Sequence, residues 1–268
     1  MPTTKEIAQG LLDSSGFPFQ SAVAERIRST RDHHGYSIAL SEHPWERENS
    51  EDSGFIDLVV EQAAARVVIE CKRTKGGVWL FTTAHDAKPN IETARCFWQG
   101  YNPDPARFGV AEFYLSPPSY QSRECILRGQ DDDNRTLLER LASKLLHSMD
   151  ALVLEEKQVS AGKNPDMFIY VPCIVTNAVL YVAKVDPAKV SLEDGTVPDF
   201  TGEQVDFIKF RKSLVTNLSP GSQPGDLRES NLDKERTIFI LNAQKIDTTL
   251  KQIAINLIRG KSPRFWSH

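Results

Sequence analysis

The sequence lacks the features that mark several common classes of protein. Its 268 residues include only four cysteines, which lie far apart and form no CxxC pair, so neither a zinc site nor a disulfide framework is indicated. No apolar run reaches the length of a membrane span, and the N-terminal stretch lacks the basic region and apolar segment of a signal peptide. We therefore expect a cytoplasmic globular protein that does not bind a membrane.

An excess of one sign of charge is also missing. The net charge is −4 and the isoelectric point is near 5.9, so nucleic acid would need a local basic surface. The basic residues that could form one fall into three groups: Arg26, Arg28 and Arg31; Lys72, Arg73 and Lys75; and Lys209, Arg211 and Lys212. The first and third groups are more often solvated faces, whereas the second lies beside a candidate site.

That site lies in two short apolar strands, which we expect at 55–60 and 66–71 with a turn of polar and small residues between them. Charged side chains interrupt these strands where a core would be apolar. Asp57 lies within the first strand, and Glu70 and Lys72 end the second. Because side chains alternate along a strand, Glu70 and Lys72 project from one face. If the strands pair as neighbours, Asp57 reaches the same face.

Two carboxylates and an ammonium at a strand end form a site for a divalent cation and an activated water. An acid-x-Lys triplet alone is weak evidence, because chance gives about two in a chain of this composition. Asp86 to Lys88 lies in a loop-like run, and Glu155 to Lys157 closes an expected helix. Only Glu70 to Lys72 ends an apolar strand that follows a strand with a second acid. The alternative is an exposed sheet edge whose charges serve solubility.

These residues resemble the PD-(D/E)xK phosphodiesterase superfamily, which has the restriction-endonuclease-like fold. The pattern of that family is an acid on one strand of a hairpin and acid-x-Lys on the next, here Asp57, Glu70 and Lys72. Ile56 stands where the family usually has proline. The resemblance covers residues 17–100 by motif and the rest of the chain only by the order of elements.

The resemblance implies a catalytic set of Asp57, Glu70 and Lys72. It also implies one or two Mg²⁺ (or Mn²⁺) ions held by Asp57, Glu70 and the backbone carbonyl of Cys71. In many members a helix before the first strand carries a further metal-binding glutamate, and Glu25 occupies that place here. An ordinary solvated helix glutamate is an equal alternative for Glu25.

The positions next to this set imply contacts with the substrate. Arg73 and Lys75 adjoin the expected metal and are the candidate nucleic-acid contacts. Gln99 has a counterpart near the site in some exonuclease-like members, but its companion Tyr101 is only two residues away, so we interpret Gln99 as structural.

The remaining pattern predicts one elaborated α/β domain over 1–268. Helices are expected at about 1–15, 18–30, 91–99, 134–157 and 248–258, and further strands at 36–45, 78–83, 167–176, 179–185, 204–214 and 237–241. Strand 78–83 is expected to continue the sheet, and Asn177 with Ala178 to form a tight hairpin. The fold class is a restriction-endonuclease-like core over about 17–160, a central mixed sheet flanked by helices, with a C-terminal extension of the same domain over about 161–268.

The expected function is a Mg²⁺-dependent DNA endonuclease that acts in defence against foreign DNA or in repair. Cutting of both strands would favour a homodimer, because one site cuts one strand. A second hypothesis is a nucleic-acid or protein binding module in which cleavage is weak, lost or dependent on a partner. A third is a metal-dependent hydrolase of a small phosphoester.

Overall fold

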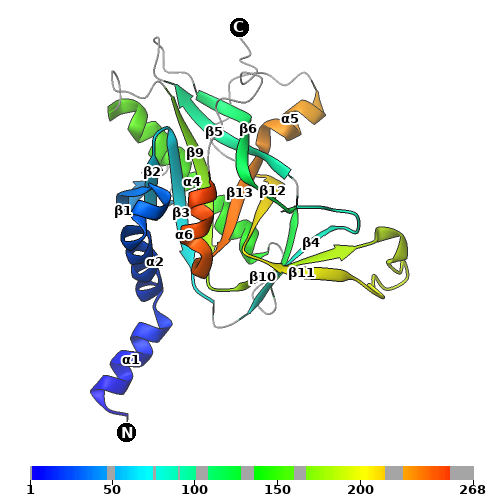
Figure 1. Cartoon of the computed structure of the whole chain (residues 1–268), viewed down its shortest axis with the longest axis horizontal. Helices are drawn as coiled ribbons and strands as arrows, with labels where there is room; N and C mark the ends of the chain where they lie inside the picture. The colour runs from blue at the N-terminus through cyan, green and yellow to red at the C-terminus, as the bar shows by residue number, and fades with distance from the viewer. Residues whose placement is uncertain are drawn as a thin grey trace.

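The computed structural model describes residues 2–46, 52–74, 77–89, 91–100, 108–127, 136–159, 167–214 and 226–253 (Figure 1). The helices are α1 (Thr4–Ser14), α2 (Phe17–Ser29), α3 (Arg31–His34), α4 (Leu137–Val159), α5 (Leu227–Lys234) and α6 (Ile246–Gln252), with 3-10 turns η1 (Pro187–Lys189) and η2 (Ala243–Lys245). The strands are β1 (Ser37–Glu46), β2 (Ser53–Gln62), β3 (Ala65–Lys72), β4 (Val78–Ala84), β5 (Ile91–Gly100), β6 (Phe108–Ser119), β7 (Gln121–Ser122), β8 (Glu124–Leu127), β9 (Met167–Thr176), β10 (Val179–Val185), β11 (Thr201–Val205), β12 (Phe207–Ser213) and β13 (Glu235–Asn242). Within these ranges no helix is both long and apolar enough to cross a membrane.

The larger sheet is mixed. Strands β1, β2 and β3 form an antiparallel meander, and β9 then lies parallel to β3. The sheet continues through β13, β12 and β7, while β5 pairs with β9 and with β6. Strand β3 therefore lies inside the sheet, with neighbours on both sides.

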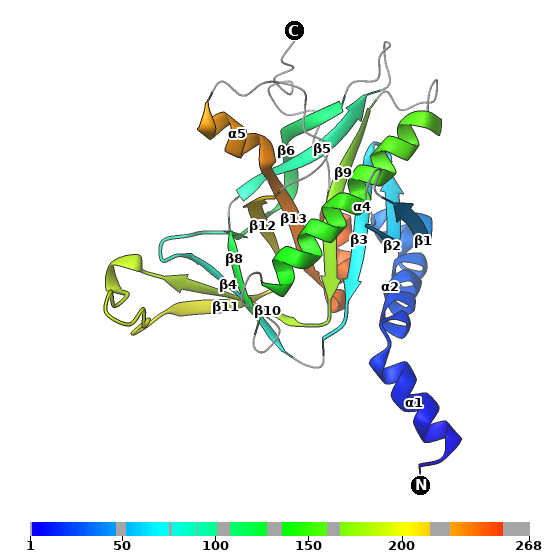
Figure 2. The same ribbon diagram turned by 180° about the vertical axis from the view of Figure 1, so that it is seen from behind.

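Helices cover both faces of this sheet, as the opposite views in Figures 1 and 2 show. On one face, α4 packs its apolar side chains, including Leu145, against Val59 and Val68. On the other, α2 and α6 pack against residues that include Val60 and Val67. The alternation along β2 and β3 thus fills two cores, and the predicted class of a mixed sheet flanked by helices is confirmed.

A smaller sheet has the strand order β11, β10, β4, β8. The prediction that strand 78–83 continues the main sheet is therefore wrong, because β4 pairs in parallel with β10. The predicted hairpin at Asn177 and Ala178 is also wrong, since β9 and β10 belong to different sheets. Asn177 instead accepts a hydrogen bond from Thr74 N–H at 2.7 Å and donates one to the Thr74 carbonyl at 2.9 Å. These bonds satisfy the backbone where the chain leaves both β3 and β9.

Two other expected elements differ from the structure. The segment expected as a helix at 91–99 is strand β5, whose Ala94 and Cys96 face one core and whose Phe97 faces the other. A strand buried on both faces has no polar side, so its apolar positions also fit a helical spacing. The run 204–214, expected as one strand, covers the end of β11 and the whole of β12. The end of the helix expected at 248–258 lies outside the described residues.

Candidate active site

The carboxyl groups of Asp57 and Glu70 lie at the open end of the β2–β3 hairpin. The antiparallel register pairs Leu58 with Ile69, so one further step along each strand places Asp57 opposite Glu70. Residues opposite one another in such a pair share a face of the sheet. Glu70 Oε1 lies 3.9 Å from Nζ of Lys144 on α4, so this face is the one that α4 covers. The predicted pairing of the two strands is confirmed.

Backbone contacts fix the position of Asp57. Its Oδ2 accepts a hydrogen bond of 2.6 Å from the N–H of Cys71, beyond the last ladder pair of the hairpin. The side-chain amide of Gln20 on α2 donates to the backbone carbonyl of Asp57 at 3.3 Å. The thiol of Cys71 packs in the opposite core, where burial raises its pKa. Asp57 is therefore held between the two strands and the neighbouring helix.

Burial gives the two carboxyls unusual proton affinities. The side chain of Glu70 is only 14% exposed; burial and the charge of Asp57 raise the pKa of Glu70 to about 7, while Lys144 and Lys72 oppose the shift. Burial likewise raises the pKa of Asp57, against the effects of the Cys71 N–H and Lys144. Two half-buried acids at opposed positions of a hairpin carry negative charge that a divalent cation would compensate.

The donor set fits a hard divalent cation by chemistry. Carboxylate oxygens are the ligands that Mg²⁺ and Mn²⁺ prefer, and Mg²⁺ is commonly held by one or two carboxylates with water and substrate phosphate. In the described part of the chain, no three His, Cys, Asp or Glu side chains form a group able to hold a metal ion. Asp57 and Glu70 would therefore be a two-carboxylate set.

Glu25 does not join that set. It lies on α2, where its side chain is 71% exposed and its Oε2 is 3.6 Å from Nη1 of Arg28. Together with Gln20 and Glu42 it lines a hollow of about 390 Å³ between α2 and β1. Since α2 packs on the opposite face of the sheet from α4, the solvated reading of Glu25 is the one that fits these contacts.

The three basic residues after Glu70 have different surroundings. Lys72 ends β3, half-buried and close enough to Glu70 to lower the pKa of that carboxyl. Arg73 donates a hydrogen bond from Nη1 to the backbone carbonyl of Asp13, near the end of α1. Lys75 lies outside the described residues.

Sequence reasoning missed Lys144. It lies on α4 beside Leu145, at the edge of the apolar stripe that packs on β3, and its side chain is 48% exposed. The sequence predicts the helix at 134–157, and Lys144 borders its apolar stripe. Which turn of α4 meets the end of β3 depends on the packing of the whole helix, and no local pattern gives it.

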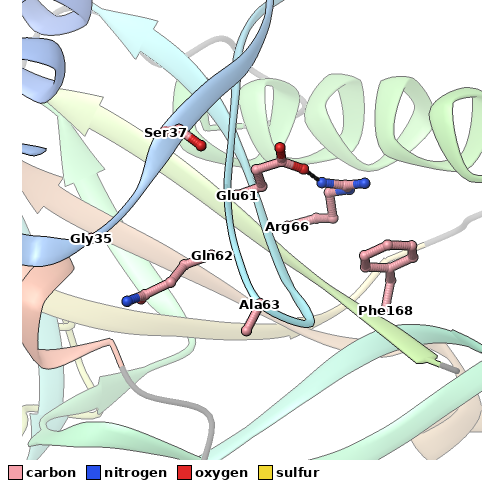
Figure 3. A pocket seen from close by; sticks show the side chains of 7 residues that line it. All are labelled: Gly35, Ser37, Glu61, Gln62, Ala63, Arg66 and Phe168. Carbon is pink, nitrogen blue, oxygen red and sulfur yellow. Dashed lines mark ion pairs between the residues drawn. The ribbon is translucent and has the colours of Figure 1, made fainter. Parts of the chain in front are cut away.

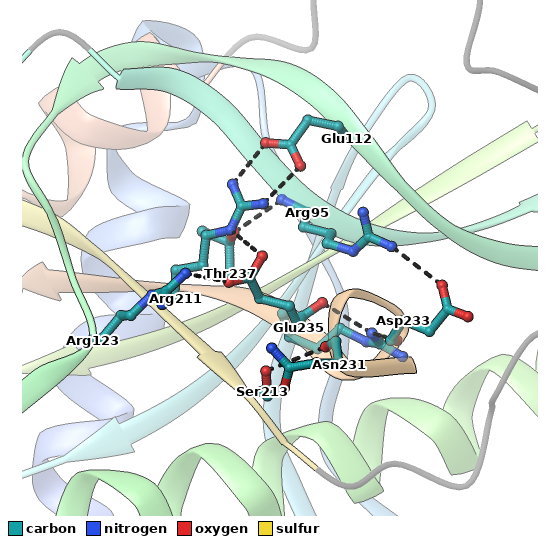
Figure 4. A network of polar contacts seen from close by, with 10 residues as sticks. Arg95, Glu112, Arg123, Arg211, Ser213, Asn231, Asp233, Glu235 and Thr237 are labelled. Carbon is teal, nitrogen blue, oxygen red and sulfur yellow. Dashed lines mark hydrogen bonds and ion pairs between the residues drawn. The ribbon is translucent and has the colours of Figure 1, made fainter. Parts of the chain in front are cut away.

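The third basic group, by contrast, is engaged in the fold, and Figure 4 shows the contacts of its Arg211. Lys209 is fully buried and donates from Nζ to the Leu115 carbonyl at 3.1 Å. Arg211 binds both carboxylate oxygens of Glu112, at 2.8 and 3.1 Å, and donates from Nε to Glu235 at 2.8 Å. These contacts leave little of the group for a nucleic-acid partner.

A second hollow, of about 350 Å³, lies at the turn end of the β2–β3 hairpin, away from the acid pair (Figure 3). The guanidinium of Arg66 lies 4.2 Å from the ring centre of Phe168 and pairs with Glu61 and Glu156. The charges at this hollow are therefore already paired. Gln99, interpreted as structural, is buried on β5 and accepts a hydrogen bond from the Tyr170 hydroxyl at 3.2 Å.

Comparison of the chain with protein-family models, with curated proteins and with solved structures found no match. Within the described residues, the strongest indication of function is the opposed pair of Asp57 and Glu70, with Lys72 on the same strand as Glu70.

Proposed function

We propose that the protein is a nuclease that hydrolyses phosphodiester bonds within DNA strands and depends on Mg²⁺ or Mn²⁺. The observation that carries this proposal is the placement of Asp57 opposite Glu70, both half-buried, at the end of the strand that continues to Lys72. A buried acid pair is costly unless a positive partner compensates it, so such a pair indicates a site with a chemical role.

The order of elements supports the same proposal. A helix, α2, precedes the meander β1–β2–β3; a second helix, α4, follows on the opposite face; and β9 then lies parallel to β3. Helix, meander and helix is the order that the PD-(D/E)xK resemblance implies, although the second helix was expected at 91–99, which is strand β5, and α4 takes its place. We propose a restriction-endonuclease-like core on this basis, with the inserted strands β4 to β8 as an elaboration.

The chemistry assigns a role to each residue. Asp57 and Glu70, with the carbonyl of Cys71, would hold the divalent ion, which when bound lowers the pKa of its water and neutralises phosphate charge. Lys72 donates hydrogen bonds to the attacking water or to a phosphate oxygen, which stabilises the charge that develops on phosphorus. The hydrogen bond from Cys71 N–H orients Asp57 and favours its ionised form, against the effect of burial.

Two observations weaken unaided DNA cleavage and so favour the second candidate, a binding module with weak or partner-dependent cleavage. Within the described residues the acid pair offers only two carboxylates to a metal, and Arg26 and Arg211 are engaged in ion pairs within the chain. A protein of this kind would bind a partner without cutting DNA by itself. A cytoplasmic location and a homodimer remain part of the nuclease proposal.

The experiment that separates these functions offers the purified protein three substrates: supercoiled plasmid, linear duplex and a chromogenic phosphodiester, each in Mg²⁺, Mn²⁺ or EDTA. The nuclease proposal predicts metal-dependent nicking of the plasmid, lost in Asp57→Asn and Glu70→Gln. Turnover of the chromogenic ester alone would indicate a hydrolase of small phosphoesters. Retention of DNA without any hydrolysis would indicate the binding module.

A further inference from the structure

Two lysines from different elements act on Glu70. Lys72 is two positions along the same strand, whereas Lys144 reaches Glu70 from α4. The distance of 3.9 Å from Lys144 Nζ to Glu70 Oε1 is at the outer limit of an ion pair. With about half of its side chain exposed, Lys144 covers apolar surface with its stem while its ammonium reaches water. The ammonium is therefore close to the acids and loosely held.

Lys144 is, within the described ranges, the one cation at ion-pair distance from either acid, and Asp57 lies opposite Glu70 on the same face of the sheet. Asp57 has a second source of stabilisation in the Cys71 N–H. Of these groups, only the two lysines favour the ionised form of Glu70. An ammonium in this place offsets the negative charge of the acid pair, as a bound divalent cation would.

We propose that Lys144 is the counter-cation of the Asp57–Glu70 pair in the metal-free protein, that it competes with a divalent cation for Glu70, and that its released ammonium then contacts a substrate phosphate. This inference rests on the proposed nuclease function. Lys144 therefore acts on Glu70 in the metal-free protein and on the substrate once the metal is bound. Lys72, fixed on the strand beside Glu70, keeps the role given to it above.

The test is calorimetric titration of the full chain with Mn²⁺ alone, without DNA, at low ionic strength. The variants are Lys144→Gln, which removes the charge, Lys144→Arg, which keeps it, and Lys251→Gln. Lys251 is an exposed lysine on α6, on the opposite face of the sheet, so its variant makes the same change in net charge away from the site. Circular dichroism of each variant checks that it is folded.

If the ammonium of Lys144 competes with the metal, its removal must raise the affinity for Mn²⁺. Lys144→Gln is expected to bind Mn²⁺ about five- to tenfold more tightly than wild type, because a cation a few ångströms from the metal is removed. Lys144→Arg and Lys251→Gln should bind as wild type does. The same Lys144→Gln protein should bind a short DNA duplex more weakly in EDTA-free buffer, with a smaller dependence on salt.

The other outcomes overturn the inference in distinguishable ways. If wild type binds Mn²⁺ through Asp57 and Glu70 but Lys144→Gln binds it equally or more weakly, then Lys144 merely ties α4 to β3, and the nuclease proposal stands. If neither protein binds Mn²⁺, the acid pair holds no divalent cation, and both the competition and the metal-dependent nuclease are contradicted.

Discussion

At the scale of single residues, the molecule places two acids where its fold would be more stable without their charge. Glu70 is buried opposite Asp57, and the attraction of two lysines only partly offsets burial and repulsion. Natural proteins keep such arrangements at sites that bind or react, because a well-packed apolar pair would give a more stable sheet. The consequence is measurable in the stability of the metal-free protein.

Glu70 should make the metal-free protein less stable as pH rises. Its folded-state pKa, about 7, lies above the ordinary value of 4.5, so its contribution is fully present below pH 4.5 and is lost as pH rises through 7. In EDTA, the free energy of unfolding should fall by about 1–3 kcal/mol from this group over that window. Glu70→Gln cannot ionise and should lack this fall. Denaturant titrations across the window check it, and parallel curves for both proteins would contradict it.

Among the helices and strands, those that local patterns determine could be predicted from the sequence, whereas those that long-range pairing determines could not. The β2–β3 hairpin and its charged face follow from strict alternation and a short turn, which involve neighbouring residues only. The pattern of β5 is compatible with a helix because both of its faces are buried, and only its pairing with β6 and β9 decides. The departure of the chain at Asn177 to a second sheet depends on Thr74, a contact across 103 positions in the sequence. No local signal carries such a contact.

The turn that ends α3 depends on a glycine. Gly35 has φ +78°, and a Cβ there would lie 2.5 Å from Nε2 of Gln62. Gly35→Ala should therefore lower the free energy of unfolding by about 1–2 kcal/mol. Gly10→Ala is the matched control, because Gly10 lies in α1 with open space around it and alanine favours helix. Equal stability of the two variants would contradict this account of the turn.

Helix α1 should contribute little to the stability of the isolated chain. No residue of α1 is buried, and it projects from the body in both Figures 1 and 2. Its apolar residues Ile7, Leu11 and Leu12 are all more than half exposed. Deletion of residues 2–14 should change the free energy of unfolding by less than about 0.5 kcal/mol. A large loss in thermal denaturation would show that this face is covered in solution.

At the scale of the whole molecule, a polar network holds β6, β12 and β13 together beside the main core (Figure 4). Arg211 is its centre, because it joins Glu112 on β6 to Glu235 on β13. Glu235 is almost fully buried, and its other partner, Arg123, is 68% exposed. The network is charge-balanced, so we assign it to the fold and not to substrate binding.

Loss of Arg211 should therefore be costly. Arg211→Met leaves Glu235 buried with one exposed partner, and we expect a loss of about 3 kcal/mol in the free energy of unfolding. Arg123→Met removes the exposed partner and should cost less than about 1 kcal/mol. Urea denaturation of both variants measures the difference, and similar losses would mean that the buried pair does not dominate the network.

We propose that Asp57, Glu70 and Lys72 form the catalytic set of a metal-dependent nuclease. The most direct measurement is the rate of plasmid nicking in Mg²⁺ by wild type, Lys72→Ala and Lys88→Ala. Lys88 is the matched control, since it ends another acid-x-Lys triplet and lies exposed after β4. We expect Lys72→Ala to lose at least about 100-fold in rate while it stays folded, and Lys88→Ala to cut as wild type does. Full activity in folded Lys72→Ala would contradict it.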